Sequence, residues 1–526
     1  MLRKIFYWVK YRRVRRIIIQ SGLFDPAWYL ENYSDISGTG NDPLTHYLLH
    51  GAKELRNPSP LFNAAQYVEQ HRNDPDVLKN PLLHYIRTAP PQEPTKRTAE
   101  ENRKIALLAA EFVGELATFE PDLSGLTQSL KKCEVPIIEG IRRDKAAAAW
   151  RKLFASFEQA YERIIFVPWL MRGDADLVAA HAAKAAIEKY GIDSLLVVIT
   201  DSHRTEARDW LPPSTHLCVL SDYDPTLSFP DRVEITSWII QALKPKSLLN
   251  VNSRACWEAI RIRGAAFATF TDLYAGLFCH DYNDDGEAIG YADAYFRQTF
   301  KHLKGVLLDN KTFADELAAQ FAIRKSDSNK LHTVYQPAPS GNSLTAALSA
   351  HHEPFPVMWA GRLCRQKNIQ LLLQIAKKDA GFKYEIFGAG EESCNTKFTR
   401  DSESISNLIW HGSYPSFESL PTEKFGAFLY TTLWDGLPNV LLAAARAGLA
   451  IVASNRGGIA ELIDETTGWL IDDFNNPDAY IAALNAIRAH PDEARRRSIA
   501  LRHRLDQKHS WEAYMNAMLT SPSFLV

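Results

Sequence analysis

A chain of 526 residues, of which 46% are hydrophobic, is too long for a single core, and we expect several globular domains. Its formal net charge of −2 gives no reason to expect a nucleic-acid partner. Six cysteines lie scattered without C-x-x-C spacing, which indicates neither a zinc site nor a disulfide framework and fits a reducing cytoplasm. No apolar run reaches the roughly 18–20 residues that span a bilayer, and we recognise no signal peptide.

The first segment, residues 1–20, is both basic and apolar. It holds seven arginine and lysine residues, no acidic residue, and interleaved Ile, Phe, Tyr, Trp and Val. A basic helix with apolar side chains can lie on an anionic membrane surface. A helix that packs on the next domain with solvated arginines explains the same pattern, so both interpretations stay open.

Residues 21–90 contain a pattern that recurs after 38 residues, beginning at Phe24 and again at Phe62. Each copy predicts a capped short helix, a polar turn and a second helix that begins at proline. Two copies predict a small helical module. His46 and His84 occupy equivalent places at helix-core spacing, without acids at ligand spacing, so we expect structural roles for both.

A charged, proline-rich linker and further helices are expected at residues 91–160. From residue 161 onward, apolar segments of strand length alternate with helical segments, which is typical of doubly wound parallel sheets in an α/β protein. We expect one such domain at 161–345 and a second at 346–500, with a linker at 341–356. The strands expected in the first domain lie at 164–167, 195–200, 217–220, 247–251, 266–271 and 305–308.

The stretch LYTTLWDGLPNVLLAAARAGLAIVASNRGG, which begins at Leu429, is the most informative part of the sequence. An apolar strand ends before the turn Trp434-Asp435-Gly436, and a Leu- and Ala-rich helix follows, with Pro438 at its first position. A second strand and a turn at Gly457-Gly458 complete a βαβ unit. Because helix N-termini after glycine turns receive anionic groups, the pattern predicts an anion site.

This stretch resembles the C-terminal signature of the retaining GT-B glycosyltransferases, the glycosyl transferases group 1 family (glycosyltransferase family 4). The resemblance rests on the Asp435-Gly436-x-Pro438 run and on the Gly457-Gly458-x-x-Glu461 turn. It implies two Rossmann-like domains that face a cleft, the first for the acceptor and the second for a nucleotide-sugar donor. It also implies a C-terminal helix within 501–526 that crosses back to the first domain. Repeats similar to those of 21–90 accompany polysaccharide-assembly glycosyltransferases.

The resemblance implies a set of site residues as well. Asp435 is expected to contact the donor sugar, and its place before a helix also suits an N-cap. Arg362 and Lys367, in a G-R-L-x-x-x-K run, are expected to grip the diphosphate, since arginine chelates two oxygens and lysine acts as a point charge. His280 and Asp281 are expected to replace a family histidine that ends a middle strand. Further donor contacts are expected from Gly173, Gly388, Gly390, Gly436, Asn439, Val440, Leu441 and Glu461.

The sequence departs from the family pattern at three places. Ala443 stands where a second glutamate usually holds the nucleotide ribose, Asp174 replaces the second of two adjacent glycines, and the middle-strand histidine is missing. A catalytically degenerate GT-B scaffold is therefore the rival interpretation, and a sugar-nucleotide epimerase or hydrolase of the same fold is another. Asp222-Tyr223-Asp224 has the spacing of a metal-binding pair but follows a strand as an ordinary polar loop, so we expect neither a metal nor a cofactor.

The function implied is a metal-independent, retaining hexosyltransferase that moves a sugar from a nucleotide-sugar donor to a growing polysaccharide or lipid-linked glycan. O-antigen, capsule, exopolysaccharide and lipopolysaccharide synthesis are the expected contexts. We expect a cytoplasmic protein, peripheral on the inner face of the cytoplasmic membrane if residues 1–20 bind lipid. The repeats are expected to contact other assembly proteins, and no nucleic acid is expected.

Overall fold

The computed structural model divides the chain into two compact units, Met1–Ala147 and Ala148–Val526. The described residues are 11–526, without 34, 37–41, 61, 72–73, 89–98, 120–122, 132–144, 158, 341–354 and 521–522. The first half of the basic segment and most of the linker expected at 341–356 therefore lie outside the described residues. Among the helices that the structure describes, none is long and apolar enough to cross a membrane.

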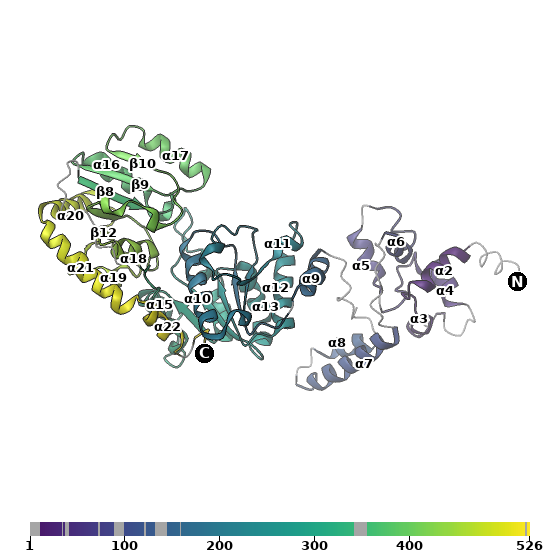
Figure 1. The fold of residues 1–526 in the computed structure, drawn as a ribbon. Helices are drawn as coiled ribbons and strands as arrows, with labels where there is room; N and C mark the ends of the chain where they lie inside the picture. The colour runs from purple at the N-terminus through teal and green to yellow at the C-terminus, as the bar shows by residue number, and fades with distance from the viewer. Residues whose placement is uncertain are drawn as a thin grey trace. The chain divides into compact units, whose positions relative to one another are not determined.

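The first unit is built from helices, and the repeat of the sequence recurs in its structure (Figure 1). Its helices are α2 (Arg12–Gln20), α3 (Pro26–Asn32), α4 (Pro43–His46) with a π-helical turn (Tyr47–Gly51), α5 (Ala64–Gln70), α6 (Pro81–Thr88), α7 (Ala99–Leu116) and α8 (Ser124–Lys131). The side chains of Asp25 and Asn63 cap α3 and α5. Pro43 and Pro81 begin α4 and α6, so each repeat consists of the two helices that its sequence predicts.

A tyrosine–histidine hydrogen bond joins the two helices of each repeat. The Tyr29 hydroxyl lies 3.2 Å from Nδ1 of His46, and the Tyr67 hydroxyl lies 2.9 Å from Nδ1 of His84. Each histidine thus connects the second helix of its repeat to the first, which is the structural kind of role expected from the sequence.

Helix α2 packs against the repeats. Ile18 is fully buried, Val14 contacts the same core, and Arg15 donates a hydrogen bond to Asp42 at 2.5 Å. Arg13 and Arg16 remain exposed to solvent. Residues 12–20 therefore form a helix that packs on the repeats, as in the second of the two interpretations of the basic segment. Its exposed arginines, Arg13 and Arg16, can still contact an anionic partner.

The second unit begins with a seven-stranded sheet of order β3-β2-β1-β4-β5-β6-β7, in which all neighbours pair in parallel. Its strands are β1 (Arg163–Val167), β2 (Leu195–Ile199), β3 (His216–Val219), β4 (Ser247–Val251), β5 (Asp272–Gly276), β6 (Gly305–Leu308) and β7 (Leu331–Thr333). Helices α9 (Lys145–Ala155), α10 (Asp174–Tyr190), α11 (Leu220–Tyr223), α12 (Phe229–Leu243), α13 (Arg254–Phe267), α14 (Arg297–Thr299) and α15 (Lys311–Gln320) accompany it. We call the part from β1 to β7 the first domain.

The strand predicted at residues 266–271 of this domain is wrong. Residues 254–267 form helix α13 after the N-cap Ser253, and residues 268–271 form the turn that follows. The strand begins only at Asp272, because Thr271 is buried in the turn and its hydroxyl donates to the carbonyl oxygen of Pro245. This strand, β5, ends at Gly276, four residues before His280.

A six-stranded parallel sheet of order β10-β9-β8-β11-β12-β13 forms the second domain. Its strands are β8 (Phe355–Ala360), β9 (Phe382–Phe387), β10 (Leu408–Trp410), β11 (Ala427–Tyr430), β12 (Ala450–Ser454) and β13 (Trp469–Ile471). The helices are α16 (Ile369–Lys378), α17 (Glu392–Ser402), α18 (Asn439–Arg446), α19 (Ile459–Leu462), α20 (Pro477–Ala489) and α21 (Pro491–Lys508). Because side chains alternate along a strand, Trp359 packs with α16 and α20 and Met358 packs with α18 and α19. Both faces of this sheet are covered, as in a doubly wound fold.

The C-terminal helices connect the two domains. Leu501 and Leu505 of α21 belong to the core of the second domain, whereas Tyr514 and Met518 of α22 (Trp511–Met518) belong to the core of the first (Figure 1). His332 of β7 lies 3.0 Å from the carbonyl oxygen of Ala517. The chain therefore returns to the first domain at its end, which is the arrangement expected for residues 501–526.

Candidate functional site

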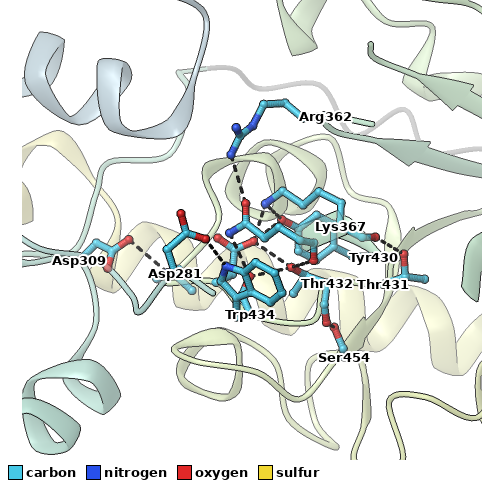
Figure 2. A network of polar contacts seen from close by, with 12 residues as sticks. Asp281, Asp309, Arg362, Lys367, Tyr430, Thr431, Thr432, Trp434 and Ser454 are labelled. Atoms are coloured by element: carbon cyan, nitrogen blue, oxygen red, sulfur yellow. Dashed lines mark hydrogen bonds and ion pairs between the residues drawn. The ribbon is translucent and has the colours of Figure 1, made fainter. Parts of the chain in front are cut away.

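The candidate site lies at the carboxyl ends of β8 and β11, which are neighbours in the second sheet. Doubly wound sheets bind their ligands at this edge. The turn after β8 carries Arg362 and Lys367, and the turn after β11 carries Trp434 and Asp435. In Figure 2, Arg362, Lys367 and Trp434 belong to one polar network that also includes Tyr430, the last residue of β11.

Lys367 is buried in an ion pair. Its ammonium group donates to Oδ2 of Asp435 and, at 2.6 Å, to the hydroxyl of Tyr430. Only 5% of the Lys367 side chain and 9% of the Asp435 side chain are exposed. Burial by itself lowers the pKa of Lys367, but the negative charge of Asp435 outweighs burial and raises that pKa above its ordinary value. The two groups expected to bind different parts of a donor are therefore bound to each other.

The two turns are hydrogen-bonded to each other at several points. The N–H of Leu433 donates to the carbonyl oxygen of Gln366 at 2.7 Å, and the Gln366 amide donates to the carbonyl oxygen of Trp434 at 3.0 Å. The Thr432 hydroxyl donates to the same Gln366 carbonyl oxygen at 3.0 Å. These bonds hold the surroundings of Lys367 in a fixed position relative to β11.

Arg362 differs from Lys367 because it is exposed at this edge. Its guanidinium donates to Oε1 of Gln366 at 3.1 Å (Figure 2). Among the described residues, the guanidinium binds a neutral amide and no carboxylate, so it can turn toward an incoming anion at little cost. Of the two predicted diphosphate contacts, Arg362 is thus the accessible one.

Gly388 and Gly390, after β9, are required by the packing of neighbouring turns. Gly388 has a φ of +130°, and a Cβ there would lie 1.9 Å from the carbonyl oxygen of Gly361. A Cβ at Gly390 would lie 2.2 Å from the carbonyl oxygen of Leu363. Both glycines therefore let the turn after β9 touch the turn after β8, which is reason enough for glycine without a ligand.

Helix α18 begins at Asn439, and its N-cap is Pro438 rather than Asp435. The alternative role of Asp435 as a helix cap is wrong, because its carboxylate is turned back to Lys367 and Tyr430. Pro438 consequently precedes the first helical position instead of occupying it.

Three main-chain N–H groups of α18 were expected to face phosphates. The N–H of Leu441 is already bonded to the carbonyl oxygen of Pro438 at 3.0 Å, so it offers little to a ligand. Asn439 is buried, whereas Val440 is half-buried. Ala443, at the place of the second family glutamate, lies in the same helix and is 7% exposed.

The first domain contacts the Trp434-Asp435-Gly436 turn directly. A Cβ at Gly436 would lie 2.8 Å from the carbonyl oxygen of Phe278 and from the carboxylate of Asp309. That carboxylate accepts a hydrogen bond from the N–H of Leu437 at 3.1 Å. Burial raises the pKa of Asp309 to about 8, and the nearby negative charge of Asp435 acts in the same direction. The absence of a side chain at Gly436 therefore allows the two domains to approach each other closely at this turn.

His280 and Asp281 have different partners although they are adjacent. His280 pairs through Nδ1 with Asp293 at 2.8 Å, inside the first domain. Asp281 accepts a hydrogen bond from the indole N–H of Trp434 at 3.1 Å, across the boundary between the domains (Figure 2). The structure thus brings Asp281, and not the side chain of His280, against the turn that carries Asp435.

Gly173 is the N-cap of α10, at the carboxyl end of β1. Its N–H donates to Asp176 at 3.2 Å, and burial raises the pKa of Asp176 to about 7. The next residue, Asp174, accepts a hydrogen bond at its carbonyl oxygen from the Asn439 amide at 3.4 Å. This turn of the first domain therefore meets the N-terminus of α18, near the predicted donor contacts.

Glu461 lies away from this network. Its carboxylate accepts hydrogen bonds from the N–H groups of Lys311 and Thr312 and from the hydroxyl of Tyr335, at 3.0, 2.7 and 2.6 Å. Burial acts against ionisation, but the hydrogen bonds from Tyr335 and Thr312 prevail and lower the pKa of Glu461. Both oxygens are engaged between the domains, so the geometry argues against the donor contact expected for this residue.

Tyr430, Gln366 and Asp309 are the residues of the network that sequence reasoning missed. Tyr430 ends an apolar strand and therefore resembles an ordinary core residue, although a hydroxyl at the carboxyl end of a central strand is a usable signal. Within the described part of the chain, no group of three or more His, Cys, Asp or Glu side chains is arranged to hold a metal ion. Asp222 lies in the short helix α11, outside this network.

Comparisons with known proteins concern the family and the fold. Residues 354–490 match the family described as glycosyl transferases group 1. The chain is 31% identical over 196 residues to the alpha-maltose-1-phosphate synthase of Mycolicibacterium smegmatis, which covers 34% of this chain and 51% of that protein. It is 26% identical over 151 residues to the amylovoran biosynthesis glycosyltransferase AmsK of Erwinia amylovora, covering 26% of this chain and 36% of that protein. The chain thus spans about half or less of the length of these relatives.

Among solved structures, Anabaena HepE in complex with UDP and glucose matches 68% of this chain and 97% of its own, with a TM-score of 0.53 and 13% identity. At this identity the likeness shows the fold. Two doubly wound domains that meet at the carboxyl edges of their sheets define a protein of the GT-B class. The match to the family described as glycosyl transferases group 1 falls within this second domain.

Proposed function

We propose that this protein is a retaining glycosyltransferase that moves a hexosyl group from a nucleotide-sugar donor to a growing polysaccharide or lipid-linked glycan. The observation that carries the proposal is the position of Arg362, Lys367 and Asp435 at one edge of the second sheet. Cations that face a carboxylate beside a helix N-terminus suit a substrate with both a diphosphate and sugar hydroxyls. The relatives named for amylovoran biosynthesis and for α-maltose-1-phosphate synthesis support a role in polysaccharide synthesis.

In this proposal the leaving diphosphate is stabilised by fixed groups of the protein. Arg362 contacts the diphosphate first, because it is exposed, and the ammonium of Lys367 joins it from the buried side. The N–H groups at the start of α18 add the positive end of a helix dipole. Neither a metal nor a cofactor is required for this stabilisation.

The acceptor belongs to the first domain in this proposal. The turn at Gly173 and Asp174 and the loop that carries Asp281 contact the second domain next to the donor residues. A retaining transfer requires little from a general base, since the leaving phosphate accepts the proton of the acceptor hydroxyl, as the family resemblance implies. O-antigen, capsule, exopolysaccharide and lipopolysaccharide chains are the acceptor types that fit this family.

A thermal-shift screen of the full chain against UDP-, GDP-, ADP- and dTDP-sugars, with and without magnesium, tests the proposal. A ligand that binds only the folded state raises the unfolding temperature, and the gain in stability grows with the logarithm of the ligand concentration relative to its Kd. We expect one nucleotide series to stabilise the protein equally well without magnesium, and the same donor to release its nucleoside diphosphate when a glycan acceptor is added. Absence of stabilisation by all four series contradicts the proposal.

A catalytically degenerate scaffold is the second candidate, and one observation favours it. Ala443 has no carboxylate at the place where the family resemblance implies a ribose contact, and Lys367 is neutralised by Asp435. A scaffold binds a nucleotide without releasing product. Turnover of the bound donor by the wild type therefore distinguishes the two candidates. In a scaffold, Ala443→Glu raises nucleotide affinity and creates turnover only where the rest of the site is competent.

The helical repeats and the basic segment are proposed to bring the protein to its acceptor. Exposed Arg13 and Arg16 on α2 suit an anionic membrane surface, and the repeats suit other assembly proteins. Such a position on the inner face of the cytoplasmic membrane places the donor site in the compartment that contains nucleotide sugars. Direct binding to lipid vesicles tests this part separately, as described below.

A further inference from the structure

Tyr430 occupies a special place in the candidate site. It is the last residue of β11, a central strand of the second sheet, and its side chain is fully buried. Most tyrosines at such positions contribute their rings to the core, and this ring stacks on Phe428 at 6.4 Å. Its hydroxyl, however, points into the polar network at the carboxyl edge of the sheet (Figure 2).

The hydroxyl connects the two residues to which the proposed function gives donor contacts. It accepts a hydrogen bond from the ammonium of Lys367 at 2.6 Å and donates one to Oδ2 of Asp435 at 2.6 Å. Lys367 and Asp435 also contact each other, so the three groups close a ring of polar contacts. A buried charged pair is stable only when its remaining hydrogen-bonding capacity is satisfied, and Tyr430 satisfies part of it on both sides.

The direction of these bonds matters for a ligand. Lys367, Tyr430 and Thr432 all direct their hydrogen bonds to Oδ2 of Asp435. Among the described residues, none donates a hydrogen bond to Oδ1. The carboxylate is thus held by one oxygen, and the other oxygen remains able to accept a bond from a sugar hydroxyl. Burial raises the pKa of Tyr430 well above its ordinary value, so the hydroxyl keeps its proton and stays a donor.

We propose that Tyr430 is a positioning residue of the donor site, whose hydroxyl orients Asp435 and Lys367 so that Oδ1 and the ammonium face one substrate. This proposal rests on the proposed function, since it assigns a task to a third residue of the same site. Tyr430 itself contacts no substrate, because its side chain has no exposed surface. Its contribution is therefore transmitted through the two groups that it holds.

The variant Tyr430→Phe removes the hydroxyl and keeps the ring. The chain offers a control in Tyr384, which is fully buried in β9 of the same sheet and whose hydroxyl has no hydrogen-bond partner among the described residues. Tyr384→Phe removes the same atom from a fully buried tyrosine on the other face of the same sheet, outside the network. A general effect of losing a buried hydroxyl appears in both variants, whereas a positioning effect appears only at Tyr430.

The kinetic measurement uses the full chain and the donor identified by the nucleotide-sugar screen. We expect Tyr430→Phe to lower kcat/KM for the donor at least about tenfold, because hydrogen bonds to charged groups are strong, while Tyr384→Phe remains close to the wild type. An unchanged kcat/KM in Tyr430→Phe, or an equal loss in both variants, overturns the proposal.

A double-mutant cycle on nucleotide affinity separates positioning from packing. If the hydroxyl acts through the carboxylate, Tyr430→Phe weakens binding of the nucleotide sugar in the wild type but has a much smaller further effect in Asp435→Asn, where only its bond with Lys367 is left to lose. Additive losses contradict a positioning role.

The failure of the proposed function gives a different result from the failure of this inference. If the wild type binds a nucleotide sugar without turning it over, the scaffold candidate is favoured, and the affinity cycle still decides the role of Tyr430. If the wild type binds none of UDP, GDP, ADP and dTDP, both the proposed function and this inference are overturned.

Discussion

Glu461 of α19 binds the main-chain N–H and the hydroxyl of Thr312, both at 2.7 Å, and Thr312 lies in the first turn of α15, a helix of the other domain. The two residues are separated by 149 positions in the sequence. A carboxylate at the N-terminus of α15 satisfies N–H groups that lack partners within the helix and faces the positive end of its dipole. Glu461 therefore acts as a cap that one domain provides for the other.

The first prediction concerns this cap. Glu461→Ala is expected to lower the free energy of unfolding by about 1 to 2 kcal/mol, because the N–H groups of Lys311 and Thr312 lose a half-buried partner. Denaturant unfolding measures the change. Glu465→Ala, which removes a nearby exposed carboxylate, is expected to change stability little. Equal effects of the two substitutions would contradict the capping role.

The second prediction separates the two cations by stability. Lys367→Met leaves Asp435 buried without its cation and is expected to cost about 3 to 5 kcal/mol of the free energy of unfolding. Arg362→Ala removes an exposed guanidinium and is expected to cost no more than about 0.5 kcal/mol. Both substitutions are expected to weaken nucleotide binding in calorimetry. Equal stabilities of the two variants would show that Lys367 is not engaged as the structure has it.

A double variant provides the control for that prediction. Adding Asp435→Asn to Lys367→Met removes the uncompensated charge and is expected to restore most of the lost stability, while nucleotide binding stays weak. Stability and binding then change independently, so a loss of binding cannot be explained by unfolding. If stability does not recover, the cost of Lys367→Met arises from packing rather than charge.

Much of the fold could be predicted because its signals are local. The strands expected at 164–167 and 305–308 are apolar runs of strand length, and both lie within strands of the structure. The repeat helices carry their own caps, as at Asp25 and Asn63. Such signals need only a few neighbouring residues, so the sequence contains them completely.

The incorrect strand prediction at 266–271 shows that local sequence alone does not always distinguish a helix from a strand. Its Ala and Phe residues suit the end of a helix as well as a strand, and the helix prevails because α13 continues from its N-cap at Ser253. The turn is then fixed by Thr271, whose hydroxyl bonds to Pro245, far away in the sequence. A choice that depends on a long-range contact cannot be made from a window of six residues.

The candidate site was predicted in its residue types but not in its connections. The resemblance pointed to Lys367 and Asp435, yet their ion pair joins positions 68 residues apart and is visible only in the structure. Glu461 has the family spacing, but its partners lie on another domain. Spacing along the chain indicates which residues share an edge of a sheet, whereas the direction of each side chain depends on tertiary packing.

The third prediction is a dependence of stability on pH that arises from Asp309. Its pKa of about 8 in the folded protein lies above the ordinary value of 3.8, so the folded state holds a proton that the unfolded state has lost between these values. Raising the pH through this range therefore favours unfolding, by on the order of 1 kcal/mol per pH unit, and the effect ends above the folded pKa. Asp309→Asn is expected to remove this slope.

Denaturant unfolding between about pH 7 and pH 8 measures the Asp309 effect, and Asp176, with a pKa raised to about 7, adds a smaller slope that the wild type and Asp309→Asn share. Burial lowers the pKa of His181 and of His509 to about 4, so these groups change stability only below their ordinary value of 6.5. Asp285→Asn, at an exposed site of the first domain, is the control and should keep the wild-type slope. Parallel slopes in the wild type and Asp309→Asn would mean that the carboxylate is ionised in the folded protein.

The last prediction tests the basic helix without disturbing its packing. Deleting residues 1–20 would uncover the core around Ile18, so charge reversal at exposed Arg13 and Arg16 is the sharper change. Each basic residue near an anionic surface contributes about 1 kcal/mol, so the double Glu variant is expected to bind phosphatidylglycerol vesicles at least about tenfold more weakly, and raised salt should reduce wild-type binding as well. Reversal of exposed Arg495 and Arg496 on α21 changes the net charge equally and should leave vesicle binding unaltered. If both pairs have the same effect, binding follows net charge alone, and α2 is only a packed helix of the repeat module.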